Sequence, residues 1–189
     1  MLQLYYTSVT GEDTPQMNYY NSLGGYRSSD VIKNDDFDNM FGEISIYTVN
    51  NNNRNQYIGL VLKNNYSSTK NNIKFWFDRP ENCYSKLYIA AIDMLQDEDG
   101  KYYMENIKDL HSSPVMAKFY EAEGEDNSVD LGSLSAGQQV GLWIKREILV
   151  DNIKSDMEDI VKQDPDNQHR VVLNEKEKED MIELNFSFD

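Results

Sequence analysis

The sequence predicts a mainly β protein, an antiparallel β-sandwich with one or two short helices. Three observations lead to this prediction. Apolar and polar residues alternate with a period of two in runs rich in β-branched and aromatic residues. Clusters of Gly, Asn, Asp and Ser separate these runs, as turns separate short strands. The chain also carries 13 Tyr, 7 Phe and 2 Trp, which supply large side chains for a packed core.

The alternating runs give the expected strands in chain order. They lie at residues 2–6, 43–49, 56–63, 72–77, 86–92, 101–104, 115–120, 139–147, 168–173 and 181–188. Asn50–Asn53 and the segment that starts at Lys63 favour turns, because asparagine and serine side chains bond to nearby backbone. Asp99-Gly100 is expected to form a tight hairpin turn, since both residues tolerate positive φ. Gly132 and Gly137 are expected to reverse the chain before the strand that carries Trp143.

Two segments have apolar residues at helical spacing, and each can form a short helix or stay irregular. The first spans residues 34–41, where Phe37, Met40 and Phe41 share one side. The second spans residues 151–165 and meets Pro165 at its end. The chain is therefore divided into an N-terminal arm or edge strand (1–20), a β-sandwich core (21–150), an insertion that can be helical (151–167) and a C-terminal β-hairpin (168–189). The hairpin would complete the sheet or contact a neighbouring molecule.

Charge and cysteine content exclude several classes of protein. The net charge is −15 and the 18 Lys and Arg form no run, so direct binding to nucleic acid is not expected. Cys83 is the single cysteine, which excludes an intrachain disulfide. The first residues lack the pattern of a signal peptide, and no run reaches the roughly 20 apolar residues of a membrane span. We therefore expect synthesis in a reducing cytoplasm and no membrane insertion.

The sequence predicts no catalytic, cofactor-binding or metal site. His111, His169 and Cys83 are too few for a zinc site or a Cys-His nucleophile, and no Gly-x-Ser-x-Gly or phosphate-binding glycine motif occurs. Two acidic clusters remain, Asp97–Asp99 and Glu121–Asp126. Their carboxylates could bind Ca²⁺, or Glu121, Glu123 and Asp126 could supply a glycosidase pair, but solvated loops of an acidic chain are favoured because the EF-hand spacing is absent.

Both tryptophans lie in strands with apolar residues on both faces. Trp76 alternates with Phe75 and Phe77, and Trp143 alternates with Leu142 and Ile144. Because one face of a sandwich strand points away from the core, each strand has apolar surface left over. Either a second buried layer within the subunit covers it, or a neighbouring copy does.

The order of these segments resembles a family of tailed-bacteriophage virion proteins. The matching segments are Ser22–Gly25, Asp36–Phe41, Tyr57–Asn64, Asn72–Trp76, Ser113-Pro114 with Phe119, Leu131–Gly137, Trp143–Arg146 and Ile182–Phe188. The acidic, Asn-rich and Tyr-rich composition is similar to that of ring proteins of crAss-like phages. Two departures, the N-terminal extension and the insertion after Arg146, leave the position within a particle open and could be arms between subunits.

The resemblance implies a non-enzymatic virion structural protein of the neck or tail, and it implies that the β-sandwich is of the immunoglobulin-like or jelly-roll kind. We expect a cyclic homo-oligomer, formed through strand edges and aromatic contacts, that also contacts other neck or tail proteins. The expected framework and interface residues are Tyr57, Trp76, Trp143, Lys145 and Arg146, with Lys145 and Arg146 as rim charges. Strands 2–6 and 182–188 are the expected donors to a neighbour's sheet edge. The alternative is a tail or baseplate module that binds a host glycan through exposed Tyr and Trp.

Overall fold

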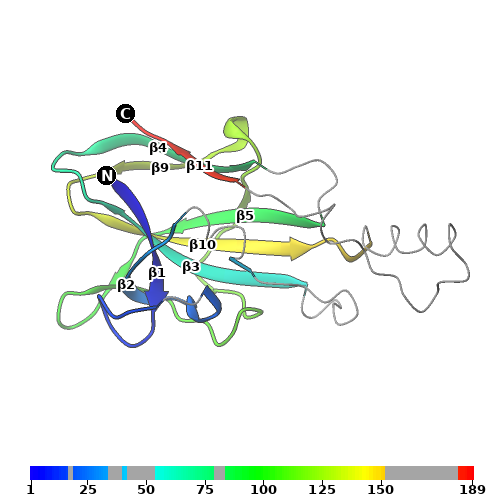
Figure 1. Cartoon of the computed structure of the whole chain (residues 1–189), viewed down its shortest axis with the longest axis horizontal. Helices are drawn as coiled ribbons and strands as arrows, with labels where there is room; N and C mark the ends of the chain where they lie inside the picture. Colours follow the sequence, from blue (N-terminus) through cyan, green and yellow to red (C-terminus); the bar gives the residue numbers. More distant parts are fainter. Residues whose placement is uncertain (17–18, 34–39, 42–53, 79–83, 152–182) are drawn as a thin grey trace, which may run out of the picture.

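The computed structural model describes residues 1–16, 19–33, 40–41, 54–78, 84–151 and 183–189. These residues form two antiparallel sheets packed face to face, which confirms the predicted fold class (Figure 1). The strands are β1 (Leu2–Ser8), β2 (Gly25–Val31), β3 (Asn55–Asn64), β4 (Lys70–Asp78), β5 (Ser85–Ile92), β6 (Leu95–Gln96), β7 (Tyr102–Met104), β8 (Tyr120–Glu121), β9 (Val129–Leu134), β10 (Gln139–Ile148) and β11 (Glu183–Ser187). Two 3₁₀ turns complete the described elements, η1 (Tyr19–Asn21) and η2 (Glu125–Asn127).

The two sheets differ greatly in width. The large sheet has the order β6-β7-β2-β1-β3-β10-β5-β8, and the small sheet has the order β11-β4-β9. The long strands β3 and β10 pair along their whole length at the centre of the large sheet, with Trp143 opposite Gly59. The small sheet therefore covers only part of one face of the large sheet.

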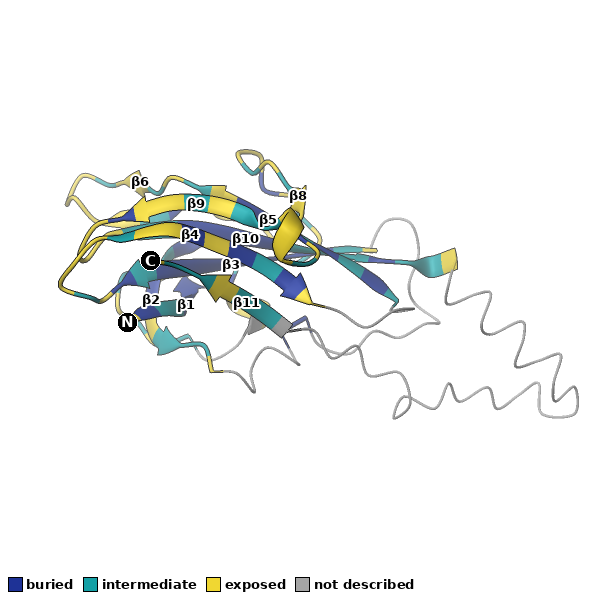
Figure 2. Ribbon diagram, turned by 90° about the horizontal axis from the view of Figure 1, so that it is seen from above, coloured by how far each residue is buried: buried dark blue, intermediate teal, exposed yellow. Residues whose placement is uncertain are grey.

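A hydrophobic core fills the space between the sheets. The small sheet contributes Ile73, Phe75 and Phe77 of β4, each at most 2% exposed. The large sheet contributes alternate residues of β3 and β10, among them Leu60 and Leu142. Figure 2 shows the buried strands of the large sheet beneath the more exposed outer face of β4 and β9. This core is the one that the period-two pattern predicted.

A second core lies on the opposite face of the large sheet. Its centre is Trp143, which is fully buried and packs with Val61, Ala90 and Met104. No strand of the small sheet reaches this face in the described part of the chain. Loop segments cover it instead, and Leu23 and Ile107 are among the residues packed there. The large sheet is thus buried on both faces near its centre.

The Ser-Leu-Gly-Gly segment, Ser22–Gly25, is held against β3 by buried hydrogen bonds. The Ser22 hydroxyl donates to the carbonyl of Gly59 over 2.5 Å and accepts from the amide of Thr7 over 2.9 Å. The amide of Gly59 donates to the carbonyl of Ser22. A Cβ at Gly24 would lie 1.9 Å from the carbonyl oxygen of Glu105, and the backbone φ there is +92°. Only glycine allows this close approach over Trp143.

One end of the sandwich is tied together by the buried side chain of Asn64. Its amide nitrogen donates to the carbonyls of Leu134, Ser68 and Ser135, and its carbonyl oxygen accepts from the amide of Tyr66. The β3–β4 and β9–β10 connections both cross between the sheets at this end. A single asparagine therefore joins the two crossings.

Several sequence predictions need correction. The expected strand 115–120 is wrong except for its last residue, since only Tyr120–Glu121 pair with β5. β2, β6 and β9 were not predicted. β9 includes Gly132, so the chain reverses later, at residues 135–138. The strand expected at 2–6 is confirmed as β1, but it is not an edge strand, because β1 lies between β2 and β3 and is paired on both sides.

The other predicted elements have mixed outcomes. The strands expected at 56–63, 72–77, 86–92, 101–104, 139–147 and 181–188 correspond to β3, β4, β5, β7, β10 and β11. The turn at Asp99-Gly100 joins β6 to β7 as the dipeptide predicted, with Gly100 at a φ of +80°. The strands expected at 43–49 and 168–173 lie outside the described residues, as do most of both candidate helices.

Candidate functional site

Tyr57 and Trp143, two of the expected framework or interface residues, lie inside the subunit. Tyr57 is 6% exposed and its ring lies 5.6 Å from that of Phe119. Trp143 has no exposed surface. Of the two explanations for apolar residues on both faces of the Trp143 strand, the second buried layer within the subunit is therefore the one observed.

Lys145 and Arg146 have partners in their own chain. The Lys145 ammonium lies 3.4 Å from a carboxylate oxygen of Glu147 and 4.4 Å from the centre of the Tyr88 ring. Arg146 donates to Oε1 of Gln56 through Nε and Nη2, over 2.9 and 2.6 Å, and also lies over the Phe41 ring. Both cations therefore bind groups of their own subunit near the C-terminal end of β10.

Trp76 has a different environment from Trp143. It lies half-buried on the outer face of β4, on the opposite side from the buried residues Phe75 and Phe77. Its register partner on β11 is Asn185, whose amide nitrogen donates to a carboxylate oxygen of Asp78 over 2.7 Å. Trp76 is thus an aromatic side chain within a polar sheet face.

The C-terminal strand β11 carries an aromatic row that the sequence analysis did not single out. Phe186 stacks on Phe75, with ring centres 5.6 Å apart, and on Phe188, at 6.1 Å. Phe188 in turn contacts Tyr66, and the Lys70 ammonium lies 5.0 and 4.5 Å from the centres of these two rings. Phe186 remains 43% exposed. The alternation of Leu184, Phe186 and Phe188 in the sequence was the available signal.

The backbone of β11 presents an open edge. Asp189 and Asn71 exchange two backbone hydrogen bonds, of 3.0 and 3.3 Å, at the end of the β4–β11 ladder. In an antiparallel ladder every second residue faces the paired strand. It follows that the N–H and C=O groups of Leu184, Phe186 and Phe188 point away from β4. β11 is the outermost strand of the small sheet, so these groups have no strand partner in the described residues.

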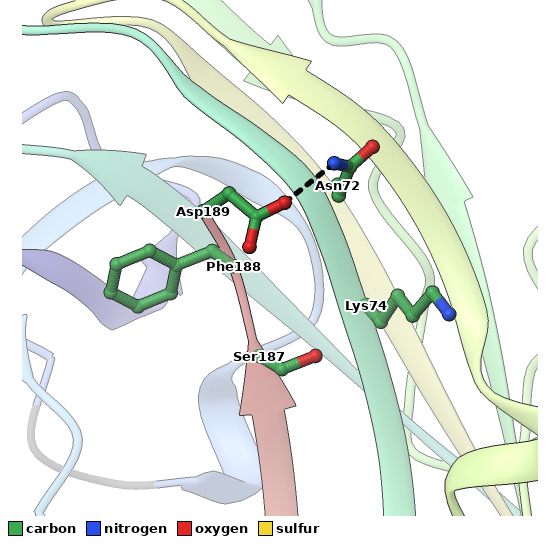
Figure 3. A pocket seen from close by; sticks show the side chains of 5 residues that line it. All are labelled: Asn72, Lys74, Ser187, Phe188 and Asp189. Carbon is green, nitrogen blue, oxygen red and sulfur yellow. Dashed lines mark hydrogen bonds between the residues drawn. The ribbon is translucent and has the colours of Figure 1, made fainter.

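The outer side of the same strand carries polar groups around a shallow depression of about 370 Å³ (Figure 3). Asn72, Lys74, Ser187, Phe188 and Asp189 line it. The Asn72 amide donates to a carboxylate oxygen of Asp189 over 2.7 Å, and Phe188 points to the other side of the strand. β11 therefore has an aromatic inner side and a polar outer side.

The other strand edges of the described fold are blunted. β6 and β8, at the two ends of the large sheet, have two residues each. β9 contains Gly132 at a φ of +69°, and the amide of Gly132 donates to the carboxylate of Asp130 over 2.7 Å. Short strands, bulges and charges are the usual means of preventing edge-to-edge pairing. β11 has none of these within its central residues.

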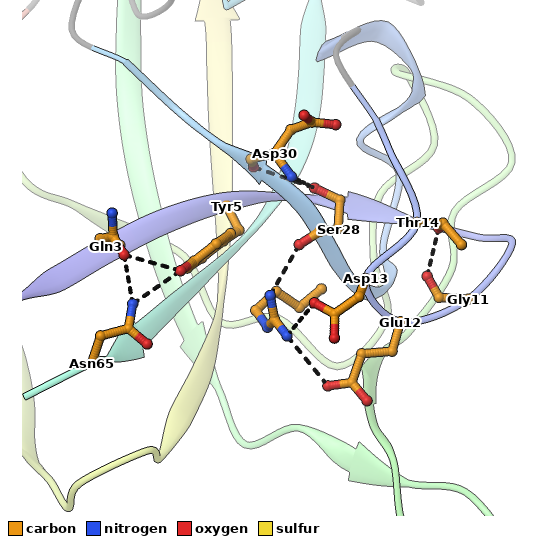
Figure 4. A network of polar contacts seen from close by, with 10 residues as sticks. Gln3, Tyr5, Gly11, Glu12, Asp13, Thr14, Ser28, Asp30 and Asn65 are labelled. Atoms are coloured by element: carbon orange, nitrogen blue, oxygen red, sulfur yellow. Dashed lines mark hydrogen bonds and ion pairs between the residues drawn. The ribbon is translucent and has the colours of Figure 1, made fainter.

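The buried side chain of Arg27 forms a polar cluster near the N-terminus with Glu12 and Asp13, which Figure 4 labels. The side chain of Arg27 is 8% exposed and forms ion pairs with Asp13 at 2.5 Å and with Glu12 at 3.7 Å. It also lies 4.9 Å from the centre of the Tyr5 ring. These contacts hold the loop after β1 against β2. The role of the cluster is therefore to stabilise the fold.

The acidic clusters behave as turns and surface pairs. Asp97 accepts hydrogen bonds from the backbone amides of Lys101 and Asp99, which lower the pKa of this carboxyl, and the hydroxyl of Tyr26 also donates to it. The same hydrogen bond to Asp97 raises the pKa of Tyr26. Glu121 pairs with Lys86 at 3.0 Å. Among the described residues, no group of three His, Cys, Asp or Glu side chains could hold a metal ion.

Comparisons with known proteins give no further information about this chain. No protein-family model, no curated protein and no solved structure matches it. In the described ranges, no helix has the length and apolar character to cross a bilayer. In the described part of the chain, the β11 edge is the strongest candidate interaction surface, because open backbone groups and an exposed aromatic ring lie together there.

Proposed function

We propose that this chain is a non-enzymatic structural subunit of a tailed-bacteriophage particle, located in the neck or tail. It assembles with further copies and with other virion proteins, and the family resemblance implies closure into a ring. The observation that carries the proposal is the open edge of β11, where backbone groups that have no strand partner among the described residues coincide with the 43% exposed Phe186. An open edge beside exposed aromatic surface is a template for strand addition from another polypeptide.

The rest of the described fold supports this proposal. In the part of the chain that the structure describes, the other strand edges are short or irregular, while β11 combines backbone groups without a strand partner and an apolar row. The net charge of −15 keeps free copies apart before assembly. Closure into a ring of more than two copies requires at least one further interface on each copy in addition to the β11 edge.

The proposal is tested by a charge placed on the open edge. Phe186→Asp should prevent incorporation of the chain into particles, because the carboxylate would be buried without a partner when a strand is added. Val115→Asp is the matched control, since Val115 is 88% exposed on a loop and receives the same charge. Incorporation is measured by mass spectrometry of purified particles after complementation. Normal incorporation of Phe186→Asp, or absence of the wild-type chain from particles, would refute the proposal.

A second candidate function, binding of a host glycan, is favoured by the position of Trp76. An aromatic ring beside Asn185, Asp78 and Lys74 offers both a flat apolar surface and groups for sugar hydroxyls. This function predicts that the isolated chain binds host surface polysaccharide and that Trp76→Ala abolishes the binding. It also predicts particles that assemble without the chain but fail to adsorb. The assembly function predicts no binding and particles that do not form completely.

A further inference from the structure

We infer that the partner of the β11 edge is β11 of a second copy, so that two subunits pair about a two-fold axis through Phe186. This inference rests on the proposed role of the β11 edge in assembly and names its occupant. Residues 184–188 are complementary to a second copy of themselves in three respects: their backbone, their inner side chains and their outer side chains.

The backbone of this segment matches itself in an antiparallel register. The groups that point away from β4 belong to Leu184, Phe186 and Phe188. When Phe186 lies opposite Phe186 of the second molecule, Leu184 lies opposite Phe188 of the second molecule. These are the positions that exchange hydrogen bonds in an antiparallel pair, because such pairs alternate with a period of two. All three outward positions of each strand therefore find a partner at once.

The side chains match in the same register. On the inner side, Phe186 meets Phe186 and Leu184 meets Phe188, so that apolar groups lie opposite apolar groups. On the outer side, Asn185 meets Ser187, which gives a pair of hydrogen-bonding side chains. Cross-strand pairs of these kinds stabilise antiparallel sheets. An interface about a two-fold axis needs this self-complementarity, because both subunits contribute the same surface to it.

The pairing also explains the exposure of the aromatic row. Phe186 stacks on Phe75 and Phe188 within one subunit and is still 43% exposed, on the outermost strand of the small sheet. A second β11 would extend this stack across the two-fold axis and join the two small sheets into one. The interface spans only about five residues, or roughly 17 Å. We therefore expect a weak, concentration-dependent dimer that becomes populated when a particle brings copies together.

Salt distinguishes a second copy from a different partner. Each copy has a net charge of −15, and Asp189 lies directly after the paired segment. Screening should therefore strengthen self-association as the salt concentration rises from about 0.05 to 0.5 M. A basic partner strand would show the opposite dependence. Sedimentation equilibrium of the full chain at both salt concentrations measures this directly.

Cysteine cross-linking tests the register. In a Cys83→Ser background, Phe186→Cys places two thiols opposite each other at a hydrogen-bonded pair, with Cα atoms about 5.5 Å apart. This separation is within the range of roughly 4.4–6.8 Å that a disulfide spans. Leu184→Cys is the matched control, since the two Leu184 positions would lie about 14 Å apart. Mild oxidation should give a dimer of Phe186→Cys at least about tenfold faster than of Leu184→Cys.

A mixture of Leu184→Cys and Phe188→Cys provides the second measurement, because these residues are opposite one another in the proposed register. It should form mixed dimers, and circular dichroism should show that each variant is folded. Equal rates for Phe186→Cys and Leu184→Cys, or self-association that weakens with salt, would overturn the self-pairing. If Phe186→Cys does not cross-link within particles that contain the chain, self-pairing fails while the proposed function stands.

Discussion

The two tryptophans of this protein occupy equivalent sequence patterns and opposite environments. Trp143 and Trp76 each lie in a strand whose neighbouring residues face the core between the sheets. Trp143 is fully buried because loop segments cover the second face of the large sheet. Trp76 stays half-buried because the outer face of the small sheet carries polar side chains and has no second core in the described residues.

The difference shows what decides whether the second face of a strand is buried. The strand itself supplies an apolar residue in both cases. Among the described residues, however, a loop segment of small residues packs directly on the second face of the large sheet, and none packs on the outer face of the small sheet. Ser22–Gly25 and Gly59 provide that contact for Trp143. An apolar residue on the second face of a sheet is therefore buried when a loop can pack on that face, and small residues in the loop and in the sheet make this close packing possible.

The largest expected effect comes from removal of the buried indole. Trp143→Ala should lower the free energy of unfolding by about 3–5 kcal/mol, because it leaves a cavity in the second core. Urea or guanidinium unfolding followed by circular dichroism measures this. A loss below about 1 kcal/mol would mean that the second face is loosely packed, and the comparison with Trp76 would fail.

A methyl group at the contact between the strand and the covering segment should have the next largest effect. The Cβ of Gly59→Ala would lie 3.0 Å from the amide nitrogen of Gly24 and 3.2 Å from Cζ3 of Trp143. We expect a loss of about 1–3 kcal/mol from overpacking. In a Trp143→Phe background the loss should be smaller, since one of the two contacts is relieved. An unchanged loss in that background would show that the indole is not part of the contact.

Removal of the outer indole should matter less to stability. Trp76→Ala should cost about 0.5–1.5 kcal/mol, because a half-buried side chain loses only part of its packing and leaves no closed cavity. The same unfolding measurement, made beside Trp143→Ala, gives the ratio of the two effects. Equal losses for the two variants would contradict the difference in burial that separates them.

The smallest expected effect on stability comes from a change in the β6–β7 hairpin, whose residue Met104 packs in the second core with Trp143. Hydrogen bonds lower the pKa of Asp97 below its usual value of 3.8. A carboxyl with a depressed folded-state pKa stabilises the fold above its unfolded-state pKa and loses this contribution as the pH falls through its folded-state pKa. Asp97→Asn should therefore lower the Tm at neutral pH, and the difference from wild type should shrink below about pH 3.8. A difference that grows on acidification would contradict the assigned shift.

Much of the fold followed from local sequence patterns, and the exceptions have physical reasons. The strands at 56–63 and 139–147 were predicted because their alternate residues, such as Leu60 and Leu142, are apolar and face the core between the sheets. β2 was missed because its polar sequence, Gly25–Val31, is buried by loops and ion pairs around Arg27 rather than by apolar alternation. β9 was missed because Gly132 within it resembles a turn residue.

The candidate site was only partly predictable. The segment 182–188 was expected to contact a neighbour, and the structure places β11 at an edge, but the same expectation for residues 2–6 was wrong. Edge and centre positions depend on which distant strands pair, and local alternation does not encode this. Lys145 and Arg146 were assigned to a rim for the same reason, since their partners Glu147, Gln56 and Phe41 include residues about 90 to 105 positions away.

The buried Asn64 has a consequence for how the molecule opens. Its side chain joins both crossings at one end of the sandwich, so that end can separate only by breaking all of these hydrogen bonds together. The two sheets should therefore stay together longest at the end where Asn64 lies. Local separation of the sheets should begin along the β11 edge, which has no strand partner among the described residues. Amide protons near Asn64 should exchange with solvent last, and those of Leu184, Phe186 and Phe188 first, until a neighbouring molecule covers that edge.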